Sequence, residues 1–86
     1  MARIIAAVAG AFGLTQTGLR YARGGDTRRI AAWIGWYEGL ARLRSIAAAL
    51  RIGSSGHAGD LVRQCERMLV RNPDLQRKVD LALATL

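Results

Sequence analysis

The chain is poor in the residues that build disulfide frameworks and metal sites. Its 86 residues include one cysteine, one histidine and one proline. Cys65 has no second cysteine to pair with, and Cys65 and His57 are too few for a zinc site. One histidine, one cysteine and six scattered acids do not assemble a nucleophile–base pair, a carboxylate pair or a metal cluster. We therefore expect no enzyme activity, no cofactor and no metal, and the lone thiol fits a reducing cytoplasm.

Long apolar runs are also missing, because much of the hydrophobic half of the sequence is alanine. No stretch approaches the length of a transmembrane helix. Residues 1–14, MARIIAAVAGAFGL, have the order of a weak secretory signal, namely one arginine, an apolar run and small residues. The helical spacing of Ile5, Val8 and Phe12 instead predicts a first helix that ends near Phe12 or Gly13.

Acidic residues and lysine are scarce, whereas arginine is abundant. The net charge is +7, and Lys78 is the one basic residue among thirteen that is not an arginine. Residues 1–59 hold eight arginines against Asp26 and Glu38, so the positive charge lies mainly in the first two-thirds of the chain. This balance predicts a polyanionic partner, and nucleic acid fits arginine best. An anionic membrane is the alternative, although no helix pairs a bulky apolar face with a lysine-rich one.

Hydrophobic periodicity predicts a single all-α domain of six helices without strands. A short second helix over 14–21 has Leu14 and Leu19 facing inward and Thr15 or Thr17 as its cap. The last helix follows Asn72 and Pro73, which read as N-cap and first helical residue. Its inward face combines Leu75, Val79, Ala82, Leu83 and Leu86.

The third predicted helix, TRRIAAWIGWYEGL, holds most of the aromatic side chains. Asp26 or Thr27 can cap it, and Gly39 marks its end. Four large residues share one face and are expected at the centre of the core: Ile30, Trp33, Ile34 and Tyr37. A stacking platform for single-stranded bases is the alternative reading of these aromatics. Trp36 falls off this face, so we expect it to be partly exposed or to pack against a neighbouring helix.

Residues 43–69, LRSIAAALRIGSSGHAGDLVRQCERML, are typical of a helix-turn-helix. The first helix has an apolar stripe, and a break of glycines and serines at 53–56 follows it. The second helix rebuilds the stripe with Leu61, Val62, Cys65, Met68 and Leu69. Its polar side carries Arg63, Gln64, Arg67 and Arg71. The pattern predicts a recognition helix for the DNA major groove, and an ordinary helical hairpin is the alternative.

The order of these elements resembles the C-terminal DNA-binding domain of DnaA-type bacterial replication initiators. It also resembles the related domain of transposases associated with repetitive elements. IIAAVAGAFGLTQTGL is similar to the family's opening helix, turn and short second helix. TRRIAAWIGWYEGL and LRSIAAALRIG resemble the arginine-led third helix and the helix before the recognition helix, without a gap from Thr27 to Leu50. NPDL resembles the entry to the last helix in the transposase-linked versions.

The resemblance implies a Trp-repressor-like helix-turn-helix fold and a DNA-binding surface. A basic loop with Arg20 and Arg23 is expected at the minor groove and phosphates, and Arg28 at the DNA backbone or a base edge. The alternatives are solvated loop charges, and an ion pair of Arg28 with Asp26 or another carboxylate. The full set of residues expected to contact DNA is Arg20, Arg23, Arg28, Arg44, Ser54, Ser55, His57 and Arg63.

The chain departs from the initiators in the part that reads sequence. Their D-H-S/T-T-V motif is missing, and GSSGHAGDL stands in its place. The nine-base initiator target is therefore not expected, and neither a phosphate-binding G-x-x-x-x-G-K-S/T motif nor a transposase nuclease motif is present.

The prediction is a sequence-biased domain that binds double-stranded DNA at the nucleoid, either free-standing or as part of a larger protein. The rival prediction is a helical protein-interaction module that recruits a partner or dimerises through Trp36 and the last helix.

Overall fold

The computed structural model describes residues 1–21, 26–39 and 41–86, and within them every element is a helix. The all-α prediction is confirmed for this part of the chain. The bounds are α1 Ala2–Phe12, α2 Gln16–Tyr21, α3 Asp26–Tyr37, α4 Leu43–Ala49, α5 Ser55–Arg71 and α6 Pro73–Ala84. None of these helices is both long and apolar enough to cross a lipid bilayer.

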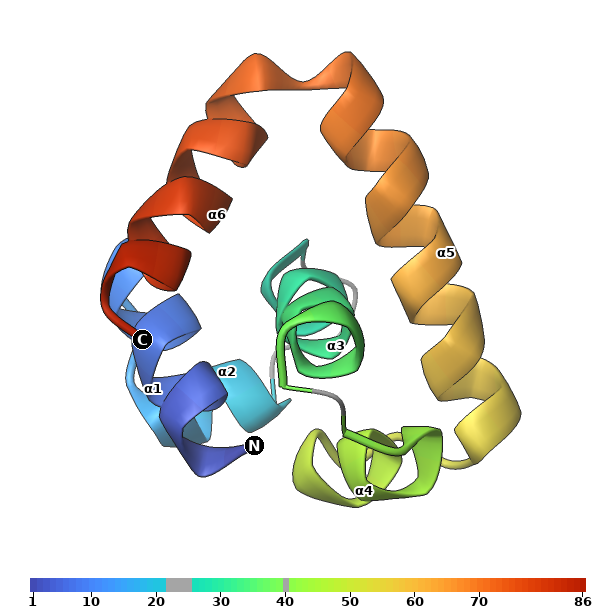
Figure 1. Cartoon of the computed structure of the whole chain (residues 1–86). Helices are drawn as coiled ribbons and strands as arrows, with labels where there is room; N and C mark the ends of the chain where they lie inside the picture. Colours follow the sequence, from blue (N-terminus) through green and yellow to red (C-terminus); the bar gives the residue numbers. More distant parts are fainter. Residues whose placement is uncertain (22–25, 40) are drawn as a thin grey trace.

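Helix α3 lies at the centre of the molecule, and the other helices wrap around it (Figure 1). Helices α5 and α6 form an inverted V whose apex lies above α3, with α4 below α3 and with α1 and α2 below α6. The most extensive contact between helices joins α3 to α5, and α3 also packs on α1, α2 and α4. Helix α6 packs mainly on α1. The face of α5 that points away from α3 is therefore left to solvent.

Buried side chains from all six helices form one continuous cluster. Helix α3 supplies its centre through Ile30 and Ile34, which are fully buried, as the helical spacing predicted. The other large, fully buried side chains are Ile5, Val8, Leu19, Ile46, Leu50, Cys65 and Val79. Aliphatic residues thus hold the helices together, and the aromatic residues lie nearer the surface.

Three inward positions expected from the sequence are wrong, and each lies at or beyond the end of a helix. Leu14 is 41% exposed, because its N–H donates to Ala9 O and so completes the end of α1 instead of starting α2. Tyr37, the last residue of α3, is 48% exposed. Leu86 follows the end of α6 and is 42% exposed. Periodicity holds within a helix, whereas side chains at its ends leave the core.

The predicted cap residues of two helices are confirmed. Thr15 Oγ1 accepts from the N–H of Gly18 at 2.9 Å before α2. Asn72 Oδ1 accepts from the N–H of Leu75 at 3.1 Å, and Pro73 begins α6. Helix α3 ends at Tyr37, two residues before Gly39.

Gly39 lies where the chain leaves α3 and passes close to α1. A Cβ atom on this residue would come within 2.7 Å of Ile4 Cδ1 and within 3.1 Å of the carbonyl oxygen of Gly35. A side chain here would therefore force the Ile4 side chain and the Gly35 carbonyl to shift, and this favours glycine.

Candidate nucleic-acid interface

The connection between α4 and α5 is a compact turn with a left-handed residue at its start. The N–H of Ile52 donates to Ala47 O at 2.8 Å, and the N–H of Arg51 faces Ala48 O at 3.4 Å. This pair of bonds is a Schellman motif, in which the residue directly after the helix C-cap is usually glycine. Here Arg51 takes that position with φ 55°, and Ile52 is buried behind it.

Arg28 reaches this turn from α3, which lies 22 residues earlier in the sequence. Its Nη2 donates to Leu50 O at 2.6 Å and to Arg51 O at 3.2 Å. These carbonyls belong to the end of α4, where backbone oxygens lack helical partners. The predicted DNA contact of Arg28 is therefore accompanied by a structural contact that the sequence did not suggest. The alternative pairing with Asp26 belongs instead to Arg29.

Helix α5 starts at a capped and exposed first turn. Ser54 has an extended backbone, and its Oγ accepts from the N–H of His57 at 3.1 Å. Ser55, Gly56 and His57 are exposed around it. The small side chains leave this end of the helix narrow, so that another surface can approach its backbone closely.

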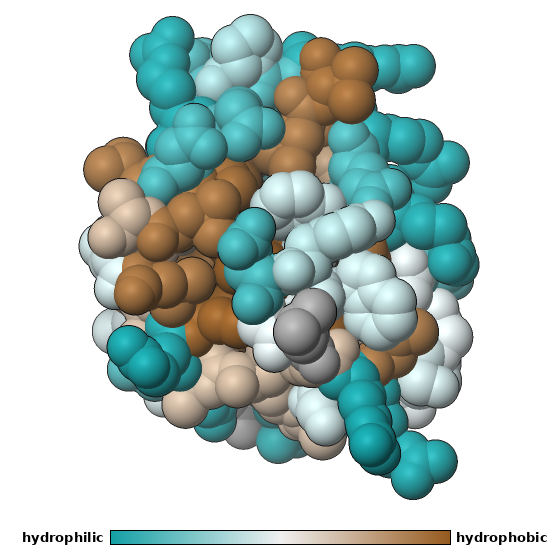
Figure 2. All heavy atoms as spheres, viewed as in Figure 1, coloured by the Kyte–Doolittle hydropathy of each residue, from teal (hydrophilic) through white to brown (hydrophobic). Residues whose placement is uncertain are grey.

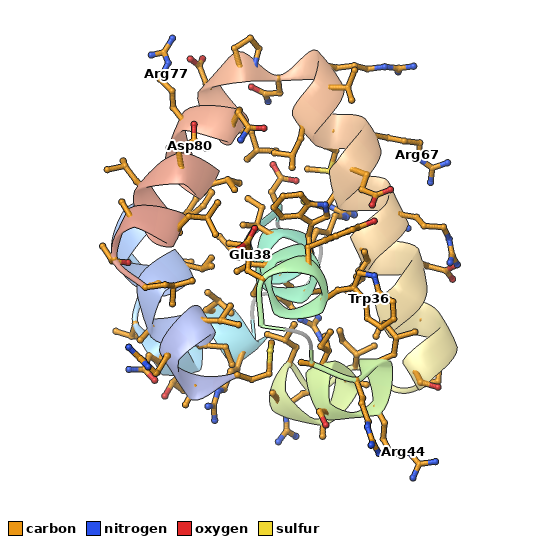
Figure 3. The ribbon with its side chains drawn as sticks, viewed as in Figure 1. Trp36, Glu38, Arg44, Arg67, Arg77 and Asp80 are labelled. Carbon is orange, nitrogen blue, oxygen red and sulfur yellow. The ribbon has the colours of Figure 1, made fainter. Side chains whose placement is uncertain are left out.

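The outer face of α5 carries arginines at every fourth residue. Arg63, Arg67 and Arg71 are exposed and opposite to the buried stripe of Leu61, Cys65 and the residues beside them. Figure 3 shows Arg67 directed away from the molecule on the α5 side. In Figure 2 the surface along the edge of the view where α5 lies is largely hydrophilic. Arg63 forms an ion pair with Asp60, one turn before it.

A shallow groove beside this face is lined by Arg29, Gln64, Arg67, Met68 and Arg71. Arg29 joins it from α3, since its Nε donates to Gln64 Oε1 at 2.9 Å and its Nη1 contacts Asp26 Oδ1 at 3.2 Å. Side chains of three arginines from two helices thus line one groove. A guanidinium group pairs well with phosphate.

The α4–α5 unit, defined as residues 42–71, concentrates positive charge. It contains six arginines against Asp60 and Glu66. The Glu66 carboxylate accepts a hydrogen bond from the Tyr37 hydroxyl, which raises the pKa of Tyr37. The Tyr37 ring also lies against Trp33, with ring centroids 5.3 Å apart. One of the two acids is therefore used to attach α5 to α3.

The structure brings five of the eight predicted site residues together on the α4–α5 unit: Arg44, Ser54, Ser55, His57 and Arg63. Arg44 points out from α4 at the bottom of the view in Figure 3. Arg20 lies on α2, whose main packing partners are α1 and α3, and it is partly buried. Arg23 lies outside the described residues.

Sequence reasoning left out Arg29, Arg67 and Arg71 as site residues. The spacing of four residues from Arg63 to Arg71 was the available signal for two of them. Arg29 could not be found in this way, because its place beside Gln64 depends on the crossing of α3 and α5.

Cys65 offers no reactive thiol to this surface. Its side chain is fully buried, and burial raises the pKa of the thiol to about 12, with Asp26 and Glu66 adding to the effect and Arg29 opposing it. The thiol therefore stays protonated at neutral pH and behaves as a small hydrophobic group. No group of three potential metal ligands occurs within the described ranges.

Comparison of the chain with protein-family models, with curated proteins and with solved structures found no match.

Proposed function

We propose that the chain binds double-stranded DNA with a sequence bias, with α5 in the major groove. The observation that carries this proposal is the row of Arg63, Arg67 and Arg71 on the outer face of α5. An α-helix fits the major groove, and arginine pairs with phosphates and with the edge of guanine. An α-helix with its side chains is about 10–12 Å in diameter, which matches a major groove about 12 Å wide.

Each residue has a role set by its position. Arg67 and Arg71, with Arg29 beside them in the groove of the protein, contact phosphates at the rim of the DNA major groove. Arg44 on α4 contacts the phosphates next to the start of α5. Ser55 and His57 in the first turn approach base edges, since the N-terminal end of a recognition helix enters most deeply.

Ser54 and Arg28 act through the backbone in this proposal. Ser54 Oγ holds the first turn of α5, and Arg28 holds the carbonyl end of α4. Both keep α5 at a fixed angle to α4, which sets the docking geometry of a helix-turn-helix.

The resemblance to the initiator domain supports this proposal. In that arrangement α4 and α5 are the helix-turn-helix, and α3 is the arginine-led helix. The initiator's own target is not included, because GSSGHAGDL replaces the motif that reads it. Location at the nucleoid follows from DNA binding.

A titration of the chain with labelled duplex DNA at several salt concentrations tests the proposal. We expect binding at low salt. The logarithm of the binding constant should fall linearly with the logarithm of the salt concentration, with a slope of about 0.9 per phosphate contact. Single-stranded DNA and vesicles of anionic phospholipid are the comparison ligands, and both should bind less tightly. Absence of duplex binding at low salt contradicts the proposal, and tighter binding to the vesicles favours a membrane surface.

A protein-interaction module is the second candidate, and the surface formed by α1 and α6 favours it. Leu81 is 59% exposed beside Leu86, and both line a shallow depression with Ala6, Gly10 and other small residues of α1. Figure 3 shows Trp36 on the α5 side of the view and Asp80 of α6 on the opposite side. Trp36 and α6 are therefore separate surfaces in any such role. Oligomerisation that depends on concentration and is lost in Leu81→Glu supports this candidate.

A further inference from the structure

The ion pair of Asp60 and Arg63 lies in the middle of the surface proposed to meet DNA. Arg63 Nη2 contacts Asp60 Oδ1, and the two side chains are 66% and 53% exposed for arginine and aspartate. The guanidinium also lies over Gly59, with Nη1 at 3.6 Å from the place of a Cβ atom on that residue. Arg63 therefore folds back along α5 towards the first turn of the helix.

An acid at this position works against simple attraction to phosphates. Of the two acids in the α4–α5 unit, Glu66 accepts a hydrogen bond from Tyr37, whereas Asp60 faces Arg63 on the outer side. The helix dipole does not account for it either. Asp60 is the sixth residue of α5, and the favourable effect of the dipole on an acid is confined to the first turn.

Helix α6 provides a contrasting pair with the same spacing. Asp74 and Arg77 are 3.4 Å apart and are 83% and 79% exposed. Asp74 lies in the first turn of α6, where the dipole favours a carboxylate. The helix dipole thus favours Asp74, whereas what α5 itself gains from Asp60 is the pairing with Arg63 one turn later.

We propose that Arg63 reads a guanine in the major groove and that Asp60 is the residue that positions it. This inference rests on the proposed function. A guanidinium has five donors, so one bond to Asp60 leaves others free to face a base. Guanine presents two acceptors, O6 and N7, which suit an arginine held in one orientation.

The carboxylate of Asp60 adds a second element of selection. It accepts a hydrogen bond from an amino group such as N4 of cytosine, and it repels an acceptor such as O4 of thymine. The pair therefore selects a guanine for Arg63 and a cytosine for Asp60, either in the same base pair or in the adjacent one. An arginine without Asp60 would distinguish cytosine from thymine at that place less well.

Selection of bound duplexes from a random pool tests this proposal on the full chain and four variants. Arg63→Lys and Asp60→Asn change the pair on α5, and Arg77→Lys and Asp74→Asn are the matched controls on α6. The unchanged chain should enrich one G·C position, and both α5 variants should reduce that preference about tenfold or more. The α6 controls should keep the enriched sequence.

The affinity of Asp60→Asn for an unselected duplex at low salt gives an independent measurement. We expect it to stay equal or to rise, because a negative charge is removed from the DNA-facing side. If the chain binds duplexes but enriches no G·C position, or if both α5 variants enrich the same sequence as the unchanged chain, the role of the pair is overturned and DNA binding stands. If the chain binds no duplex at low salt, both proposals are overturned.

Discussion

Helices α5 and α6 begin alike and then differ in what they present to solvent. Each starts after a residue whose side chain accepts the N–H three positions on, from Ser54 to His57 and from Asn72 to Leu75. Each carries an aspartate and an arginine three residues apart on its exposed side. On α5 two more arginines continue the row, whereas α6 balances Arg77 and Lys78 with Asp74 and Asp80.

This comparison distinguishes the features that a helix needs for folding from the features that are available for binding. Caps and an apolar stripe are shared, so they explain folding and carry no functional information. The surplus of arginine on α5 contributes nothing to packing, since these side chains are exposed. It is also unfavourable through repulsion between like charges. In the proposed function, the phosphates of the DNA offset this repulsion.

The largest expected effect is a loss of folding stability at alkaline pH, which arises because the two helices bury different groups. The core side of α6 has no titrating group, whereas α5 contributes Cys65. Because its pKa is raised from 9.0 to about 12, the unfolded chain loses the proton first, and stability falls as pH rises through this window. At about 1.4 kcal/mol per pH unit, the loss approaches 4 kcal/mol by pH 12.

Chemical denaturation at pH values between 9 and 12 measures this loss, with Cys65→Ala as the comparison. The variant should have a smaller slope of stability against pH. Tyr37→Phe removes a second raised pKa, which acts in the same direction. Equal slopes for the unchanged chain and Cys65→Ala would show that the thiol does not set the alkaline limit.

The second effect tests the two outer faces at equal charge. Arg67→Ala with Arg71→Ala removes two positive charges from α5, and Arg77→Ala with Lys78→Ala removes two from α6. We expect the α5 variant to bind duplex DNA more weakly and to lower the salt slope by about two units. The α6 variant should lower both much less. Similar losses in both variants mean that net charge alone attracts the DNA, with no docking face.

The third effect concerns the two N-cap side chains. Their removal should lower the stability of the fold to a similar extent but should affect DNA binding differently. Ser54→Ala and Asn72→Ala should each cost about 1 kcal/mol, because each leaves a helical N–H without its side-chain acceptor. For a domain of this size the melting temperature then falls by roughly 4–8 °C. Only Ser54→Ala should also weaken duplex binding, measured well below the melting temperature. An equal decrease in binding for Asn72→Ala contradicts the special role of the first turn of α5.

The smallest effect concerns the left-handed residue before α5. The same helix ending occurs after α1, where Gly13 has φ 69°, and after α4, where Arg51 has φ 55°. Arg51→Gly should be more stable than Arg51→Ala by up to about 1 kcal/mol, since alanine keeps the steric cost and glycine removes it. Thermal denaturation of the two variants measures this difference. Equal stabilities show that the turn holds no strain.

The sequence was sufficient for features that depend on neighbouring residues. The apolar spacing of Ile30 and Ile34 and the cap residues Thr15 and Asn72 operate within one or two turns of a helix, and all four are confirmed. The inward positions predicted for Leu14, Tyr37 and Leu86 were wrong, because periodicity does not show where a helix ends or how far the neighbouring helix covers it.

The candidate site was predictable in part for the same reason. The polar side of α5 follows from its own spacing, whereas the contact of Arg28 with Leu50 O needs two segments 22 residues apart to meet. The groove that Arg29 shares with α5 needs the crossing of two helices. No pattern within a single helix contains that information.

The contact of Trp33, Tyr37 and Glu66 makes the indole an internal optical probe of the docked helix. Trp33 lies against a ring whose hydroxyl is bonded to α5, so a shift of α5 relative to α3 changes the surroundings of the indole. Trp36, on the same helix, is 41% exposed and reports on solvent. The intrinsic fluorescence of the chain, with Trp36→Phe to isolate Trp33, can therefore follow ligand engagement by α5 without an attached dye.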